Sequence, residues 1–303
     1  MDLRHLRYFI CVAEEMHFGR AAMRLGISQP PLSQQIRALE AELGVRLFDR
    51  SSRRVSLTAA GEMFLPEARA TLAQAELAAQ TARRAHAGEI GQLRLGFTTS
   101  GPFVEAVAGA LYAFRRACPN VEFSLAELGR DEQISRVEAG LLDFGIVRSP
   151  TSPFLPEGLT STLILKEPVM VAMRADHPLA SRQNEIALSM LASEPFVLYN
   201  DIIGAGFNEH FTTLCRKAGF SPHIAQEAGS LATLLGLVAA GFGLTILTRS
   251  LTRLHLESVV YCPLAEASAL SGLWLVAGSN PSPAARSFLD CLRHTIDAAE
   301  SID

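Results

Sequence analysis

The chain is 303 residues long, about half of it hydrophobic, and carries a formal net charge of −4. This length suits about two domains, and the composition excludes a disordered chain or a uniformly polybasic nucleic-acid binder. Charge is divided unevenly, because residues 1–60 hold nine Arg and six acidic residues, a balance of +3, which leaves −7 for the remainder. A basic head on an acidic body is expected if only the head meets phosphate.

No apolar segment typical of a secretory signal follows Met1, and no run approaches the ~18 apolar residues of a membrane helix. We therefore expect a cytoplasmic protein without membrane contact. The five cysteines are scattered, which indicates reduced, mostly buried thiols: Cys11, Cys118, Cys215, Cys262 and Cys291. Cys215 lies on the apolar face of a predicted helix, so a packing role is favoured over a redox-sensing one. The eight His are dispersed, and no metal site is expected.

Three short helices are predicted in the head. Leu3, Leu6, Phe9, Ile10 and Ala13 recur with helical period, 20–25 form a second helix ended by Gly26, and a third runs from Ser28 to Leu43. Ser28 is expected to cap this third helix with its hydroxyl, and prolines are tolerated in a first turn.

The third helix has two faces. Leu32, Ile36, Leu39 and Leu43 form an inward stripe, while Pro30, Ser33, Gln34 and Arg37 lie opposite. Such a polar face can enter the major groove, where Gln pairs with adenine and Arg with guanine, although an ordinary solvated face is an equal alternative for this helix alone.

The segment that follows favours the DNA-reading interpretation. Residues 46–50 lead into Ser51-Ser52-Arg53-Arg54 and then 55–57, a pattern typical of a two-stranded β wing with a basic tip. We therefore predict a DNA-binding surface made of ten residues: Ser28, Gln29, Pro30, Pro31, Ser33, Gln34, Arg37, Arg50, Arg53 and Arg54.

Residues 1–61 closely resemble the winged helix-turn-helix head of LysR-type transcriptional regulators. The motifs in register are Ala21-Ala22, Ser28-Gln29-Pro30, Ser33, Leu39-Glu40, 47–50 and 57–61. The resemblance implies an effector-responsive DNA-binding regulator that assembles as a dimer or a tetramer (a dimer of dimers). Its partners would be double-stranded promoter DNA, a small organic effector and RNA polymerase, with no cofactor. The sequence is most similar to the branch that regulates aromatic catabolism.

A linker helix is predicted over 58–88, after the 1–57 head. Residues 65, 68, 72, 75, 79, 82 and 86 form a mostly alanine a/d seam, which indicates pairing with a second copy. A single helix lying on its own domain is the alternative, and Pro66 predicts a bend or a restart there.

From residue 89 onward strands and helices alternate, which predicts an α/β sensor domain with mostly parallel sheets. The resemblance implies a two-lobed, periplasmic-binding-protein-like fold, with lobe I at 89–163 and 268–303 and lobe II at 164–267.

Ligands of such sheets bind beyond the carboxyl ends of the strands. Thr98-Thr99-Ser100 follows one strand and was expected to open a helix, so it suits an anion or simple helix capping. Arg148 follows another strand and suits a carboxylate or a structural salt bridge. The predicted site for a carboxylate effector, such as an aromatic acid, comprises Thr98, Thr99, Ser100, Gly129, Arg130, Arg148, Ile202, Ile203 and Phe207.

Other functions are less well supported. Gly236, Gly241 and Gly243 fit a helix end and a turn better than a nucleotide loop. Ser100, His177 and Asp201 lack the GxSxG elbow, so no catalytic residue and no enzyme activity are expected. A solute-binding or transport-associated protein is the alternative function, and the appended winged helix argues against it.

Overall fold

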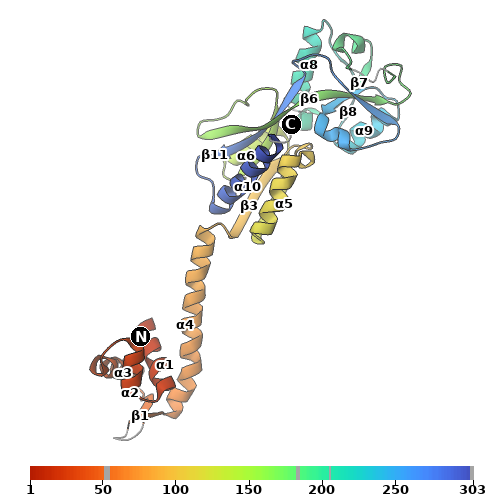
Figure 1. Cartoon of the computed structure of the whole chain (residues 1–303). Coiled ribbons are helices and arrows are strands. Elements are labelled where there is room, and N and C mark those ends of the chain that lie inside the picture. Colours follow the sequence, from red (N-terminus) through yellow and green to blue (C-terminus); the bar gives the residue numbers. More distant parts are fainter. Residues whose placement is uncertain (51–54, 182–184, 205, 301–303) are drawn as a thin grey trace. The chain divides into compact units, whose positions relative to one another are not determined.

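The computed structural model describes residues 1–50, 55–181, 185–204 and 206–300. The chain divides into two compact units, residues 1–84 and 85–303 (Figure 1). No helix in these described ranges is both long and apolar enough to cross a membrane.

Three helices and a β ribbon form the head: α1 (Leu3–Glu15), α2 (Phe18–Leu25), α3 (Gln29–Leu43), β1 (Phe48–Arg50) and β2 (Val55–Leu57). The two strands pair antiparallel, with Phe48 opposite Leu57, so the predicted ribbon is present. Phe48 fixes the ribbon on the helices, because its ring centroid lies 5.3 Å from that of Phe9 and 5.9 Å from that of Phe18. The predicted inward stripe of α3 is confirmed at Leu32, Ile36 and Leu39, which are fully buried.

The expected cap of α3 is wrong in one respect. Ser28 occupies the N-cap position in an extended conformation, but its hydroxyl makes no capping hydrogen bond. Such a hydroxyl bonds the N–H of the second or third helical residue. These residues are Pro30 and Pro31, which have no N–H. In α2 the same task falls to His17, whose Nδ1 accepts from the backbone N–H of Gly19 and Arg20 at 3.0 and 3.2 Å.

The linker is a single helix, α4 (Ala59–His86), which continues through Pro66. Its first turns lie on the head: Ala68 is buried in the head core, and Phe64, Leu65 and Leu72 pack against that core. Gly61 permits this approach, because a Cβ there would lie 2.2 Å from the carbonyl oxygen of Leu47. Three residues of the predicted seam, at 65, 68 and 72, therefore contact their own domain.

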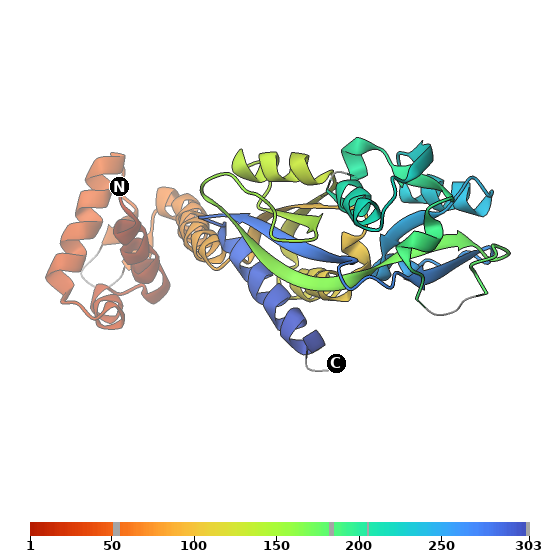
Figure 2. The ribbon, with the colours of Figure 1, turned by 90° about the horizontal axis from the view of Figure 1, so that it is seen from above.

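The first lobe of the sensor domain is a three-layer sandwich (Figure 2). Its sheet contains β3 (Ile90–Phe97), β4 (Asn120–Glu127), β5 (Phe144–Ser149), β11 (Leu270–Gly278) and the first part of β6 (Leu159–Arg174). Helices α5 (Glu105–Ala117) and α10 (Pro283–Glu300) cover one face, around Phe114 and Phe288. Helix α6 (Arg130–Glu138) covers the other face through Val137.

The second lobe repeats this layering around the end of β6, which pairs with β9 (Thr245–Thr248) and β10 (Val259–Pro263). β7 (Pro195–Tyr199) pairs with β8 (His223–Ala228) and joins β9 through a bridge between Phe196 and Leu244. Helix α8 (Phe207–Lys217) packs on one face, with Cys215 fully buried, and α9 (Leu231–Ala239) packs on the other. Short α7 (Asp201–Gly204) follows β7.

The expectation of mostly parallel sheets is wrong. β3 pairs parallel with β4 and β5, and β7 with β8, but the pairings of β6 with β9, β10 and β11 and of β11 with β5 are antiparallel. The reason is β6 itself: its 16 residues run through both lobes, and sequence patterning identified only its end at 169–174. Its partner changes from β11 to β9 between Pro168 and Val169, five residues beyond the predicted lobe boundary at 163.

The structure also tests the interpretations of Cys215 and of the two glycines at 241 and 243. Burial raises the pKa of the Cys215 thiol to about 12, so this side chain is an inert part of the core. Gly241 and Gly243 have φ values of 84° and 147° in the turn between α9 and β9, as their turn assignment requires.

Candidate nucleic-acid interface and ligand cleft

The outer face of α3 presents the polar side chains predicted to read DNA. Gln34 and Arg37 are exposed and Ser33 is half-buried, while Ser28, Gln29, Pro30 and Pro31 form an exposed start to the helix. Helix α3 rests on α1 and α2 through its opposite, fully buried stripe. The face is therefore rigidly mounted and open to a groove of suitable width.

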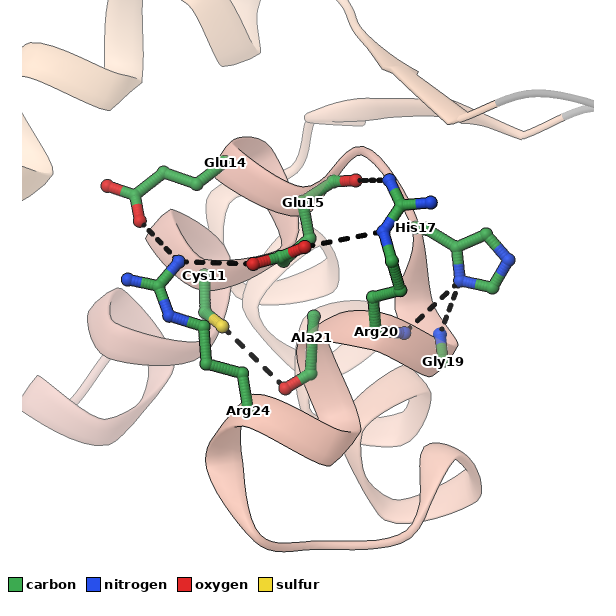
Figure 3. A network of polar contacts seen from close by, with 8 residues as sticks. All are labelled: Cys11, Glu14, Glu15, His17, Gly19, Arg20, Ala21 and Arg24. Atoms are coloured by element: carbon green, nitrogen blue, oxygen red, sulfur yellow. Dashed lines mark hydrogen bonds and ion pairs between the residues drawn. The ribbon is translucent and has the colours of Figure 1, made fainter.

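Arginines of the head differ in how freely their charge is available. On α2, Arg24 Nη1 donates to Glu14 Oε2 at 2.9 Å and to Glu15 Oε1 at 3.3 Å, and Arg20 is bonded to Glu15 (Figure 3). Arg69 of α4 also donates to Glu14, at 2.9 Å. Arg37, by contrast, forms no ion pair within the described part of the chain. Its guanidinium is the one on α3 that is available to a new acceptor.

The base of the wing is held by Glu40, a residue of the Leu39-Glu40 motif to which the sequence assigned no structural role. Its Oε1 accepts from the backbone N–H of Leu47 and Phe48 at 2.9 and 3.1 Å, and its Oε2 binds Arg50 Nη2 at 2.6 Å. The Arg50 guanidinium also lies 5.0 Å from the Phe18 ring centroid. Arg50, predicted to contact DNA, is thus also part of the wing's internal structure. Arg53 and Arg54 lie outside the described residues.

In the sensor domain a small cavity of about 40 Å³ lies between the lobes. Six predicted residues line it, namely Thr98, Thr99, Ser100, Arg148, Ile203 and Phe207, together with Tyr199, Leu247, Thr248 and Leu251. Ligand sites for organic molecules usually measure several hundred Å³. The structure is therefore a nearly closed form, and a larger molecule requires side-chain movement or separation of the lobes.

Arg148 is buried and extensively bonded. Its Nη2 pairs with Glu167 Oε1 and contacts Ser250 Oγ at 3.2 Å, while its Nε donates to Ser100 Oγ at 2.9 Å. Burial lowers the pKa of the guanidinium, and the charge and hydrogen bond of Glu167 raise it. Glu167 is fixed in turn by the N–H and hydroxyl of Ser250, at 2.7 and 2.8 Å. Arg148 thus forms the structural salt bridge considered from the sequence, and it also borders the cavity.

Three buried polar atoms on the cavity residues have no partner among the described residues: Thr98 Oγ1, Arg148 Nη1 and Tyr199 OH. All three can donate a hydrogen bond. An unsatisfied buried donor costs ~1–3 kcal/mol, so this arrangement favours a bound molecule that carries acceptor oxygens. Burial, and then the charge of Glu127, raise the pKa of Tyr199 against the opposing effect of the neighbouring Thr99 side chain, so the Tyr199 hydroxyl stays protonated and can donate.

The turn at 98–100 differs from the expected helix start. It leads into a three-residue 3₁₀ segment at Gly101–Phe103, and α5 begins only at Glu105. The predicted start of a helix directly after the turn is therefore wrong, because Val104 is extended and separates the 3₁₀ segment from α5. The turn contributes side chains instead: Ser100 accepts from Arg148, and Thr99 Oγ1 donates to Glu127 Oε1 at 2.6 Å.

Three predicted ligand residues are not among those that line the cavity. Ile202 is 73% exposed, and Arg130 Nε binds Asp131 Oδ1 at 2.7 Å. Gly129 and Gly206 serve close packing of the lobes: a Cβ on Gly129 would lie 2.3 Å from the Ile202 carbonyl oxygen, and one on Gly206 would lie 2.0 Å from Arg130 Nη1. These residues form a contact between lobes beside the cavity.

Sequence reasoning missed Tyr199, Leu247, Thr248 and Leu251. Tyr199 and Thr248 end β7 and β9, so the strand-end rule used for the first lobe would have found them in the second. A larger groove of about 650 Å³ lies nearby; it shares Glu167 and Ser250 with the buried ion pair but includes none of the predicted ligand residues.

The structure also bears on a catalytic triad and on a metal site. Ser100 and His177, two of the three residues compared above with a catalytic triad, have other partners. Ser100 accepts from Arg148, and His177 contacts Glu194 and the backbone N–H of Leu179. Within the described ranges, no three side chains of the His, Cys, Asp or Glu type come close enough to hold a metal ion.

Comparison with known proteins agrees with this two-part organisation. A model of the bacterial regulatory helix-turn-helix protein, lysR family, matches residues 3–62, and one of the LysR substrate binding domain matches residues 86–297. The uncharacterized HTH-type transcriptional regulator YnfL of Escherichia coli strain K12 is 47% identical over 290 residues, which cover 95% of this chain and 96% of that protein. The regulator AlsR of Bacillus subtilis strain 168 is 36% identical over 291 residues, 95% of this chain and 94% of its own.

Among solved structures, that of full-length CbnR complexed with its target DNA superposes with a TM-score of 0.81 at 28% identity. The match covers 98% of this chain and 100% of CbnR.

Proposed function

Because this chain belongs to the LysR family of transcriptional regulators, we propose that a small carboxylate bound between the lobes of its sensor domain controls how its winged head engages promoter DNA. Members of the family bind DNA and are not enzymes, and their second domain binds small effectors. The proposal adds the chemical class of the effector and the residues that hold it.

One observation carries the ligand assignment: three residues that line one cavity each have a buried donor without a partner among the described residues. A carboxylate has two oxygens and about four acceptor positions, enough for Thr98, Arg148 and Tyr199 together. Ile203, Phe207, Leu247 and Leu251 supply apolar surface for the rest of the molecule. An apolar pocket with a few convergent polar groups suits a small organic anion, aliphatic or aromatic.

The test compares carboxylic acids with their uncharged amides on the full-length protein. We expect the acids to raise the midpoint of thermal unfolding and the amides to leave it unchanged. Tyr199→Phe removes one donor and should weaken acid binding about tenfold, since a hydrogen bond to a charged group contributes ~1.5–3 kcal/mol. Tyr112→Phe is the matched control, because Tyr112 is exposed on α5, away from the cavity. Equal stabilisation by acids and amides contradicts the proposal.

Binding must also differ between two arrangements of the protein, since a ligand shifts an equilibrium only by its differential affinity. We propose that the lobes separate to admit the ligand and that this change alters the assembly on DNA. The head would place α3 in the major groove, with Ser33, Gln34 and Arg37 toward the bases and the wing toward the backbone. Such a regulator would act in the cytoplasm beside the chromosome and RNA polymerase.

The assembly is proposed to be a dimer paired through α4, and a dimer of dimers built by the sensor domains. Because Leu65, Ala68 and Leu72 are engaged with the head, pairing would use the rest of the seam, such as the half-buried Ala75 and the exposed Ala79. Ala75→Glu with Ala79→Glu places like charges in that seam and should halve the mass measured by light scattering. Glutamates at Gln74 and Gln80, off the seam, are the control. A monomeric wild-type protein contradicts this proposal.

A further inference from the structure

We infer that the cleft selects a molecule with a single carboxylate and rejects a dicarboxylate, and that Glu127 at its rim is the residue that discriminates between them. This inference rests on the proposed carboxylate site. It narrows the effector to a compact monocarboxylate with an apolar remainder.

The wall of the cavity carries no net charge. Among the described lining residues Arg148 alone is ionic, and its charge is already matched by Glu167. Glu167 is 8% exposed and receives hydrogen bonds from Arg148 and from the N–H and hydroxyl of Ser250. The pair therefore presents hydrogen-bond donors without a net positive charge.

A negative charge, that of Glu127, lies beside the cavity. Glu127 ends β4, and its Oε1 accepts from the hydroxyl of Thr99, a lining residue, at 2.6 Å. Its charge also acts on Tyr199, on the opposite lobe. Glu127 is exposed and does not itself line the cavity, so the negative group lies beside the cavity, next to Thr99.

A free cation near Glu127 would offset its negative charge. Arg130 is the nearby candidate, since it lies against Gly206, but its Nε is bonded to Asp131 at 2.7 Å. Arg130 with Asp131 and Arg148 with Glu167 are both neutral pairs, which leaves Glu127 as the uncompensated charge of the group. A second carboxylate on a ligand would meet that charge beside a space of about 40 Å³, whose four apolar lining residues offer it no partner.

One carboxylate remains acceptable because three donors await it. Thr98 Oγ1, Arg148 Nη1 and Tyr199 OH gain partners when it binds. The second carboxylate of a dicarboxylate has no comparable donors left among the described lining residues and would lose its hydration. Charge and hydrogen bonding therefore favour the same class of ligand.

The experiment titrates the full-length protein calorimetrically with pairs of equal carbon skeleton: acetate and oxalate, butyrate and succinate, 2-methylbenzoate and phthalate. In the pair whose size fits, the monocarboxylate should bind at least about tenfold more tightly, as expected for one unit charge at close range in a medium of intermediate dielectric constant. Glu127→Gln should raise the affinity of the dicarboxylate about tenfold and change that of the monocarboxylate by less than about threefold. Glu122→Gln, on the same strand but at its start, should change neither.

The outcomes separate this inference from the proposed function. Equal binding of both members of a pair by the wild type overturns the charge selection and leaves the carboxylate site intact. A monocarboxylate preference that persists in Glu127→Gln overturns the role of Glu127. Failure of all six acids to bind overturns both the inference and the proposed effector class.

Discussion

The recognition face of α3 and the wall of the cleft use arginine in opposite ways. Arg37 is exposed and has no ion pair in the described part of the head, so its full charge is available to DNA. Arg148 is 5% exposed and engaged by Ser100, Ser250 and Glu167, with one nitrogen left toward the cavity. An exposed cation suits a polyanion that brings its own charge, whereas a neutralised and fixed one suits a small molecule recognised by shape and hydrogen bonds.

The largest effect is expected at Arg148, because its removal leaves the buried Glu167 carboxylate without its partner. Breaking such a pair costs ~3–5 kcal/mol, so Arg148→Ala should strongly destabilise the sensor domain as well as abolish the ligand response. Chemical denaturation of the full-length protein measures this cost. The double variant Arg148→Met with Glu167→Leu removes both charges and should recover much of the stability but none of the ligand binding. Wild-type stability in Arg148→Ala would contradict a stabilising role for the pair.

A smaller effect, on DNA alone, is expected at Arg37. Loss of one bidentate base contact costs ~1–3 kcal/mol and relaxes specificity at one position of the site. Arg37→Ala should therefore weaken operator binding in a gel-shift assay, narrow the gap between operator and random DNA, and leave unfolding unchanged. Gln34→Ala should act at a different base pair. If both variants keep the wild-type affinity and sequence preference, α3 does not read the bases.

The smallest effect is expected at Arg24. Its guanidinium is held by Glu14 and Glu15, and exposed pairs of this kind contribute little to stability. Because its charge is already matched, Arg24→Ala should leave the salt dependence of DNA binding nearly unchanged. A loss of about one unit in the slope of log affinity against log salt would instead make Arg24 a phosphate contact.

Much of the architecture was accessible from the sequence because local patterns determine it. The buried stripe of α3, the wing and the boundaries of α8 and α9 follow from periodicity, turn glycines and alternation. Four of the ten cavity residues followed from the rule that ligands bind at the carboxyl ends of strands, and two more, Ile203 and Phe207, from the segment predicted to face them.

The features that the sequence did not predict depend on pairing between distant segments. Arg148 on β5 reaches Glu167 across β11, whose Leu273 lies opposite Arg148 and whose Ser271 lies opposite Glu167. No local pattern announces a partner two strands away. The length of β6 was hidden for a similar reason, since its first half, LTSTLILK, has no strict alternation and pairs with β11 in one lobe, while its second half is mostly buried in the other. The missing Ser28 cap was predictable, because two prolines occupy the positions that would have donated to it.

The contact of Gly129 with the carbonyl oxygen of Ile202 has a mechanical consequence. Backbone meets backbone there without an intervening side chain, so the two lobes rest against a hard stop in the closing direction. At this contact the two lobes can move apart but cannot move closer together. Under the proposed function, a bound molecule would act by the distance to which it separates the lobes, so the size of the effector, as well as its chemistry, would determine the signal.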